Sequence, residues 1–175
     1  TLGEYVITYT STDASGNTDT ATRTVTVVDT TAPVISVTSG TDTVELGATW
    51  TDAGATADGG ETVTTSGSVD TSTVGTYTIT YSATDASGNT DTATRTVTVV
   101  DTTAPVISVT SGTDTVELGA TWTDAGATAT DLSGDVTVVS SGTVDTDTLG
   151  EYVITYTSTD ASGNTDTATR TVTVV

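Results

Sequence analysis

The sequence lacks several residue types on which enzymes and small secreted domains depend. It contains no Cys, His, Met, Phe, Lys or Gln. Without His, Cys and Lys the chain has no Ser–His or Cys–His pair, no Schiff base and no usual zinc or iron site. The absence of Cys also excludes disulfide bonds, on which small secreted domains commonly rely. We therefore interpret the chain as not an enzyme, and as a bacterial or archaeal surface protein.

Positive charge is also scarce. The chain has three arginines and 23 acidic residues, which gives a formal net charge of −20. So few cations cannot neutralise a phosphate backbone, and anionic membrane surfaces repel such a chain. No apolar stretch approaches the ~20 residues of a membrane span. These features predict no nucleic-acid partner and no membrane insertion.

The apolar residues that are present follow a strand pattern. Val, Ile, Leu and Tyr alternate with Thr, so that Tyr77, Ile79 and Tyr81 share one face of residues 76–84. The same alternation continues through residues 90–100, and no segment shows a helical period. A period of two is typical of half-buried β-strands, and a disordered acidic tail lacks it. The pattern predicts an all-β protein.

Long exact repeats divide the chain into domains. Residues 13–57 recur unchanged at 85–129, and residues 1–28 recur unchanged at 148–175. We predict three segments: a partial repeat of the second type at 1–28, a complete repeat of the first type (type A) at 29–100, and a complete repeat of the second type (type B) at 101–175. We expect this alternation to be part of a longer periodic polypeptide.

Each complete repeat predicts a compact sandwich. In type A we expect strands at 33–38, 43–46, 61–66, 68–71, 76–84 and 90–100, with a hairpin loop at 85–89. Tyr77 follows a Gly at the start of the penultimate strand, where a tyrosine corner is expected. About seven short strands in ~72 residues favour tandem immunoglobulin-like antiparallel β-sandwiches of about seven strands each.

Ordered motifs along the whole chain carry a family resemblance. They are Asp-x-x-Ala-Pro-Val-Ile, Val-Glu-Leu-Gly, Thr-Asp-Ala-Gly-Ala-Thr-Ala, Gly-x-Tyr-x-Ile-x-Tyr and Thr-Asp-Ala-Ser-Gly-Asn followed by Ala-Thr-Arg-Thr-Val-Thr-Val. The chain resembles the bacterial Ig-like repeat first named from a pesticidal crystal protein, which is similar in pattern to hyalin repeats. The resemblance implies an Ig-like sandwich used in tandem on surface and secreted proteins, and no single activity.

Acidic residues gather in the loops that an Ig-like strand order places at one end of each repeat. Ca²⁺ takes six to eight oxygen ligands, which carboxylates from separate loops supply. We therefore predict Ca²⁺ sites at the joints between repeats. The candidate ligands are Asp29, Asp52, Asp58, Glu61, Asp85 and Asn89 in type A, and Asp101, Asp124, Asp131, Asp135, Asp160 and Asn164 in type B.

Structural roles compete with these assignments. Asp85 alone fits an Asx turn, and Asp52 fits a turn cap. Arg95 lies on the same strand face as the valines, so we expect it to be buried and paired with a carboxylate such as Asp52 or Asp85, or stacked on Trp50. We expect Trp50 and its counterpart Trp122 to pack in the core, in preference to forming a sugar-binding surface.

These observations favour one function and leave two alternatives. The chain fits a structural spacer segment of an extracellular fibre or giant adhesin at the cell surface, made rigid by Ca²⁺ at its joints, with neighbouring repeats as partners. The first alternative is a segment of a self-assembling filament or surface layer with lateral copies. The second, lower alternative is a glycan-binding or cell-binding module. The sequence does not identify a distal ligand.

Overall fold

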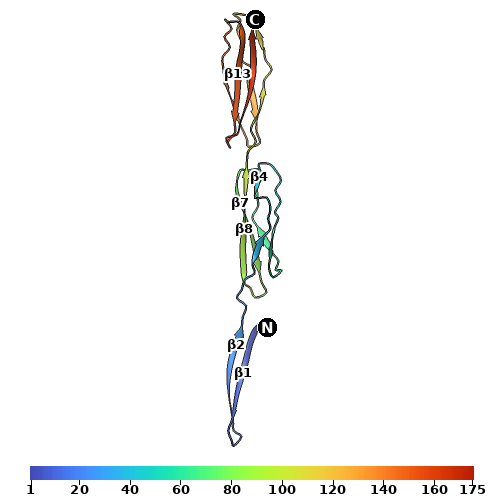
Figure 1. Cartoon of the computed structure of the whole chain (residues 1–175), viewed down its shortest axis with the longest axis vertical. Helices are drawn as coiled ribbons and strands as arrows, with labels where there is room; N and C mark the ends of the chain where they lie inside the picture. Colours follow the sequence, from blue (N-terminus) through green and yellow to red (C-terminus); the bar gives the residue numbers. More distant parts are fainter. The chain divides into compact units, whose positions relative to one another are not determined.

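The computed structural model describes residues 1–175 and contains only strands and loops (Figure 1). The strands are β1 Gly3–Thr12, β2 Thr18–Val27, β3 Ile35–Val37, β4 Thr43–Glu45, β5 Ala55–Ala57, β6 Thr64–Ser66, β7 Gly75–Thr84, β8 Thr90–Val100, β9 Val106–Val109, β10 Thr115–Val116, β11 Ala127–Thr130, β12 Thr137–Ser141, β13 Gly150–Thr159 and β14 Thr165–Val174. No helix is long and apolar enough to cross a membrane. The all-β prediction is confirmed.

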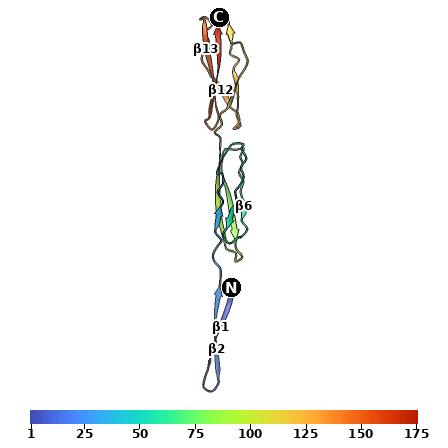
Figure 2. The same ribbon diagram turned by 45° about the vertical axis from the view of Figure 1, so that its right-hand side comes forward.

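The two complete repeats share one strand order. Type A has a four-stranded sheet, β4-β8-β7-β6, and a two-stranded sheet, β3-β5. Type B repeats this arrangement as β10-β14-β13-β12 and β11-β9, and Figure 2 shows β12 alongside β13. One pair in each four-stranded sheet is parallel, namely β4 with β8 and β10 with β14. The sandwiches are therefore antiparallel except at this edge.

The long strands form because their alternation buries one face. In β7, Ile79, Tyr81 and Ala83 are buried, and in β8 the buried residues include Val97 and Val99. The Thr residues between them lie on the more exposed face. Burying a Val or Ile side chain contributes about 1.5–3 kcal/mol, so these few positions account for much of the stabilising burial.

Each tryptophan packs on the edge of a small core. Trp50 lies against the cluster of Val44, Leu46, Val97 and Val99, and Trp122 lies against the matching cluster in type B. The indole N–H of Trp50 donates to the carbonyl of Thr41 at 2.8 Å, and Trp122 donates to Thr113 at the same distance. The prediction that both tryptophans belong to the core is confirmed.

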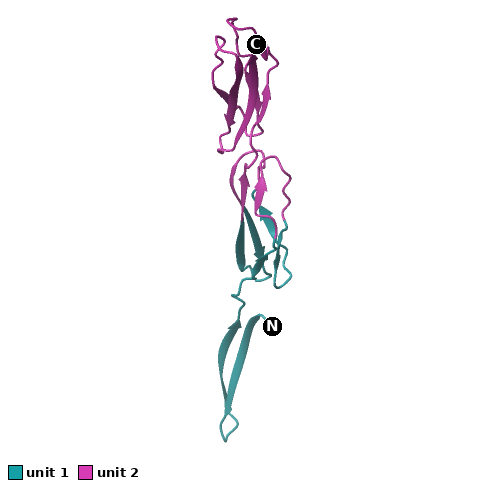
Figure 3. Ribbon diagram, turned by 45° about the horizontal axis from the view of Figure 1, so that its top comes forward, with its two compact units in different colours: residues 1–39, 53–67, 79–95 teal, residues 40–52, 68–78, 96–175 magenta.

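The chain divides into two compact units (Figure 3). The first comprises residues 1–39, 53–67 and 79–95, and includes β1, β2, β3, β5 and β6. The second comprises residues 40–52, 68–78 and 96–175, and includes β4 and all the strands from β9 to β14. The linker between type A and type B, with the loops around it, lies within the second unit.

Two short segments differ from the sequence-based expectation. Residues 55–57 form β5 and pair with β3, although the three residues Ala-Thr-Ala have little apolar surface. Residues 68–71 are not a strand. With β5 included, type A has six strands (β3 to β8), and type B also has six (β9 to β14), one fewer than the approximate number expected. Asp70 instead forms a turn by accepting from Ser72 N at 3.0 Å, and Thr71 O accepts from Gly47 N at 2.7 Å.

Two predicted local motifs are confirmed. The hydroxyl of Tyr77 donates to the carbonyl of Thr73 at 2.8 Å, which is the bond that defines a tyrosine corner. The loop after β7 is an Asx turn, because Asp85 Oδ1 accepts from the N–H groups of Ser87 and Asn89 at 2.9 and 2.8 Å. Gly88 adopts φ +89° in this loop, where other residues are strained.

Candidate functional site

The site begins at Asp101, the first residue of the linker between the two complete repeats. The loop between β13 and β14 holds this residue by both its backbone and its side chain. Asn164 Nδ2 donates to the Asp101 carbonyl at 3.1 Å, and Ser162 Oγ donates to Asp101 Oδ2 at 3.1 Å. Asp101 is buried as a result.

The same loop fixes a second carboxylate, that of Asp160. Its Oδ1 accepts from the N–H groups of Ser162 and Asn164 at 2.9 and 2.8 Å, and its Oδ2 accepts from Asn164 Nδ2 at 2.7 Å. Burial by itself raises the pKa of Asp160, but the hydrogen bonds from Asn164 and Ser162 outweigh it and the pKa lies below its ordinary value. Asp160 is therefore a charged ligand candidate at neutral pH.

A third carboxylate comes from the loop after β11. Asp131 makes a bridge with Gly134, and its Oδ1 accepts from Ser133 N at 2.7 Å. One carboxylate oxygen from each of Asp101, Asp131 and Asp160 lies within 4.8 Å of the others. Two oxygens bound to one Ca²⁺ are at most about 5.2 Å apart, which is twice the longest usual Ca–O distance. The three carboxylates thus meet the spacing that a shared cation requires.

Type A holds the next two linker residues from the other side. The Glu45 carboxylate accepts from Thr102 N at 2.7 Å, from Thr102 Oγ1 at 2.9 Å and from Thr103 Oγ1 at 3.0 Å. The hydrogen bonds from Thr102, with a smaller contribution from Thr103, lower the pKa of Glu45 below its ordinary value. Glu45 is consequently ionised when it binds the linker.

Apolar contacts accompany these hydrogen bonds. Leu46 is 7% exposed, whereas Leu118, its counterpart in the same Val-Glu-Leu-Gly motif of type B, is 53% exposed. A side chain added at Gly47 would lie 2.5 Å from Leu132 Cδ2, so the two repeats approach closely at this point. A cleft of about 430 Å³ remains beside the contact, lined by residues that include Leu46, Val74 and Ser162.

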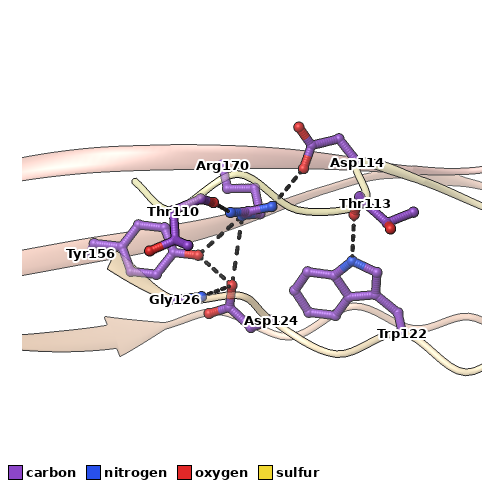
Figure 4. A network of polar contacts seen from close by, with 8 residues as sticks. All are labelled: Thr110, Thr113, Asp114, Trp122, Asp124, Gly126, Tyr156 and Arg170. Atoms are coloured by element: carbon purple, nitrogen blue, oxygen red, sulfur yellow. Dashed lines mark hydrogen bonds and ion pairs between the residues drawn. The ribbon is translucent and has the colours of Figure 1, made fainter. Parts of the chain in front are cut away.

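Asp124 lies in a different network, centred on Arg170 (Figure 4). Arg170 is buried; its Nη1 pairs with Asp114 at 2.7 Å and its Nε with Asp124 at 3.6 Å. Arg170 Nε also donates to the Tyr156 hydroxyl at 3.2 Å, and Nη2 donates to the Thr110 carbonyl. The Tyr156 hydroxyl in turn donates to Asp124. The expected pairing of the buried arginine with a carboxylate is thus found in type B, where Asp124 corresponds to Asp52.

The pKa shifts in this network have clear causes. Burial raises the pKa of Asp124, but the hydrogen bonds from Tyr156 and Gly126 and the charge of Arg170 bring it below its ordinary value overall. Burial and the bond to Asp124 raise the pKa of Tyr156. The network therefore holds an ionised Asp124 against a charged Arg170, as a structural ion pair.

The remaining predicted ligands are placed as follows. In type A the Asp85 loop holds the preceding linker, because Asn89 Nδ2 donates to the Asp29 carbonyl at 3.2 Å. Asp58 Oδ1 accepts from Val34 N at 2.8 Å and so ties its loop to the start of the first strand. Glu61 Oε2 is buried without a hydrogen-bond partner. Asp135 follows the turn at Asp131 and is not among the three grouped carboxylates.

The sequence analysis did not identify Glu45, Leu132 or Asp114. Glu45 stands between two buried residues, Val44 and Leu46, so its position in a strand marks it as outward-facing, but the chain offers no signal that a linker lies there. Leu132 is the apolar member of a loop present only in type B. Asp114 follows a Thr in a turn and has no pattern that points to an arginine.

Comparisons with known proteins agree with the family resemblance. The model of a family described as bacterial surface protein, Ig-like domain, matches residues 34–99 and again residues 110–174. No curated protein matches the chain.

Two solved structures are similar over nearly the whole chain. A protocadherin gammaB7 EC3–6 cis-dimer structure is 17% identical with a TM-score of 0.40 over 98% of this chain, and a protocadherin gammaB4 extracellular domain is 20% identical with a TM-score of 0.44 over 99%. The chain spans 58% and 36% of those two proteins, respectively.

Proposed function

Because the chain belongs to the bacterial surface protein Ig-like domain family, we propose that it is a spacer segment of an extracellular fibre or giant adhesin whose joints are made rigid by Ca²⁺. The repeats at 29–100 and 101–175 are the rigid elements in this proposal, with residues 1–28 as a partial repeat. Neighbouring repeats of the same chain are the partners, and the chain has no catalytic role.

The hydrogen bonds that both repeats make to the linker support this function most strongly. Asp101 is bound by the β13–β14 loop of type B, while Thr102 and Thr103 are bound by Glu45 of type A. A flexible tether between domains would leave its backbone groups to water. These three successive linker residues with hydrogen-bond partners are the observation that supports a rigid joint.

Ca²⁺ would complete the joint at the three grouped carboxylates. Three negative charges within 4.8 Å of one another repel unless a cation or protons compensate them. Asp101, Asp131 and Asp160 would hold the ion, and the ion would supply charge compensation and tie the linker to two loops of type B. Carboxylate oxygens are hard ligands, which suits Ca²⁺; Mg²⁺ demands a near-ideal octahedron at shorter distances.

The proposal is tested by unfolding the full chain in Ca²⁺, in Mg²⁺ and in a chelator. Extracellular Ca²⁺ modules bind at about 10⁻⁴–10⁻³ M, so ~10 mM Ca²⁺ should raise the free energy of unfolding of type B by about 1.4–2.7 kcal/mol. Mg²⁺ should raise it less. Coincident unfolding curves in all three conditions would show that the joint holds no Ca²⁺.

A matched pair of variants assigns the effect to this site. Asp131→Asn removes one charge from the group and should abolish most of the Ca²⁺ shift. Glu151→Gln removes one charge from an exposed position on β13 and should leave the shift intact. Equal losses in the two variants would mean that Ca²⁺ responds only to the overall negative charge.

A further inference from the structure

Strand β12 forms a free edge of the four-stranded sheet of type B (Figure 2). Residues Thr137–Ser141 pair only with β13, and no backbone hydrogen bond joins them to any other segment. β12 belongs to a complete repeat, and the chain enters and leaves this repeat at the ends of its strands, so neighbouring repeats do not cover the edge. An open edge presents unpaired N–H and C=O groups that can pair with another chain.

The hydrogen bonds of β12 show which of its residues face this edge. The Thr137 carbonyl accepts from Ser158 Oγ of β13 at 3.1 Å, so the backbone groups of Thr137 point toward β13. The backbone groups of successive residues in an antiparallel strand point in alternate directions. Val138 and Ser140 therefore direct their N–H and C=O groups away from β13, into the free edge.

The outer face of the sheet beside this edge is more apolar in type B than in type A. Val139 of β12 is 67% exposed, and Val153 of β13 is 50% exposed. Threonine stands at both of the corresponding positions in type A, as Thr64 and Thr78. Exposed apolar side chains that lie close together on one face commonly mark an interaction surface.

β12 also lacks the features that usually protect an edge strand from pairing. Such strands are short, or they carry charged residues or Pro. β6, the counterpart of β12 in type A, has only three residues, whereas β12 has five and none of them is charged or Pro. The chain has a net charge of −20, so two copies repel each other over most of their surface. The uncharged edge of β12 is a place where a second copy can approach, and it offers no charge that would attract a basic partner.

We propose that β12 is a docking surface for β12 of a second copy, paired antiparallel about a two-fold axis at Val139. In this register Val138 of one copy exchanges hydrogen bonds with Ser140 of the other, which uses the outward groups of both strands. The two Val139 side chains then form a directly opposed, non-hydrogen-bonded pair, with Cβ atoms about 4.5–5.5 Å apart. The proposal concerns lateral contact between chains and does not depend on Ca²⁺.

The two-fold symmetry fixes the stoichiometry of the contact. Identical surfaces that meet about a two-fold axis close at two copies. Residues 1–28 correspond to 148–175 and include no copy of β12, so this chain carries one such edge and should form dimers and nothing larger. In a polypeptide with many type B repeats, several of these contacts would act together and hold chains side by side in opposite directions.

Sedimentation equilibrium of the full chain in chelator tests the proposal. A single strand pair is a small interface, so we expect a reversible dimer with a dissociation constant on the order of 1 mM, measured at concentrations up to ~2 mM in ~0.15 M salt. Val139→Asp places two like charges opposite each other and should raise the dissociation constant at least about 10-fold. Thr64→Asp, at the corresponding position of type A, should leave it unchanged.

A backbone variant and a cysteine variant test the register. Ser140→Pro removes an N–H group that makes no bond within its own repeat, so it should abolish the dimer while the repeat stays folded. Since the chain has no Cys, Val139→Cys should form a disulfide-linked dimer at least about 10-fold faster than Thr64→Cys, because a directly opposed pair meets the Cβ spacing of a disulfide. A wild-type chain that is monomeric at ~2 mM, equal weakening by Thr64→Asp, or equal rates of disulfide formation would each overturn the proposal.

Discussion

The Glu45 carboxylate accepts a hydrogen bond from the backbone N–H of Thr102 at 2.7 Å. Glu45 lies at the end of β4 and is paired in parallel with Val100 at the end of β8. The parallel pairing of β4 with β8 therefore places the Glu45 side chain where the chain leaves type A. A side chain that anchors the backbone just beyond its own domain restricts how the next domain can turn.

The first prediction concerns this anchor. Glu45→Ala should make the Thr102 amide exchange with solvent several-fold faster, because its hydrogen-bond acceptor is removed, while the strands of type A keep their protection. Hydrogen exchange followed by NMR measures this directly. Glu151→Ala is the control, since Glu151 is an exposed carboxylate on β13. Unchanged exchange at Thr102 in Glu45→Ala would show that the linker is held by other contacts.

The second prediction separates the two carboxylates around Arg170. Asp124→Ala should lower the free energy of unfolding of type B by about 1.5–3 kcal/mol, because it leaves the Tyr156 hydroxyl without its acceptor and removes the less exposed of the two carboxylates that face the buried guanidinium. Asp114→Ala should cost less than about 1 kcal/mol, because the Asp114 side chain is 61% exposed. Urea unfolding in a Trp50→Phe background, with Trp122 as the probe, compares them. Equal losses of unfolding free energy in the two variants would mean that the solvent exposure of a carboxylate does not control the strength of its interaction with Arg170.

The long strands could be predicted from the sequence because their alternation is strong and local. Residues 90–100 were expected to form a strand, and β8 spans Thr90–Val100. The sequence could not predict β5, since Ala-Thr-Ala has little apolar surface and pairs with β3 only once the sandwich brings the two together. The expected strand at 68–71 does not form, because the Asp70 side chain accepts the hydrogen bond of the Ser72 N–H group and makes a turn.

The candidate site, like the strands, could be predicted from the sequence only in part. Asp101, Asp131 and Asp160 could be proposed together because an Ig-like strand order places their three loops at one end of the repeat. Asp124 was included for the same reason, but its loop turns it toward Arg170, which lies on a strand. Which of several acidic residues in one loop faces a linker depends on side-chain packing, and the sequence does not encode that in a local pattern.

The third prediction is that acidification destabilises the chain. The hydrogen-bonded carboxylates of Glu45, Asp85, Asp124 and Asp160 have pKa values below their ordinary values of 4.5 for Glu and 3.8 for Asp. The unfolded chain therefore binds more protons than the folded chain in this range. The stability that these groups contribute is complete above pH 4.5 and is lost as the pH falls through their folded pKa values.

Thermal unfolding measured between pH 6 and pH 2, in the presence of a chelator, tests whether stability falls on acidification. Asn164→Ala removes the side-chain hydrogen bond that lowers the pKa of Asp160, so it should flatten the pH dependence as well as lower stability. If the wild-type chain became more stable on acidification, repulsion among the grouped carboxylates would outweigh their hydrogen bonds, and the predicted direction would be wrong.

The fourth prediction distinguishes backbone strain from a steric clash at two glycines of type B. Gly142 has φ +101°, and a Cβ there would lie 2.4 Å from the carbonyl oxygen of Val153; Gly163 has φ +92° and open space around it. Gly163→Ala should cost about 1–2 kcal/mol for the left-handed backbone alone. Gly142→Ala should cost about 2–5 kcal/mol, because the Val153 carbonyl belongs to β13 and displacing it adds an overpacking penalty of about 1–3 kcal/mol. Urea unfolding of the two variants measures the difference, and equal costs would show that residues 141–142 move aside without disturbing β13.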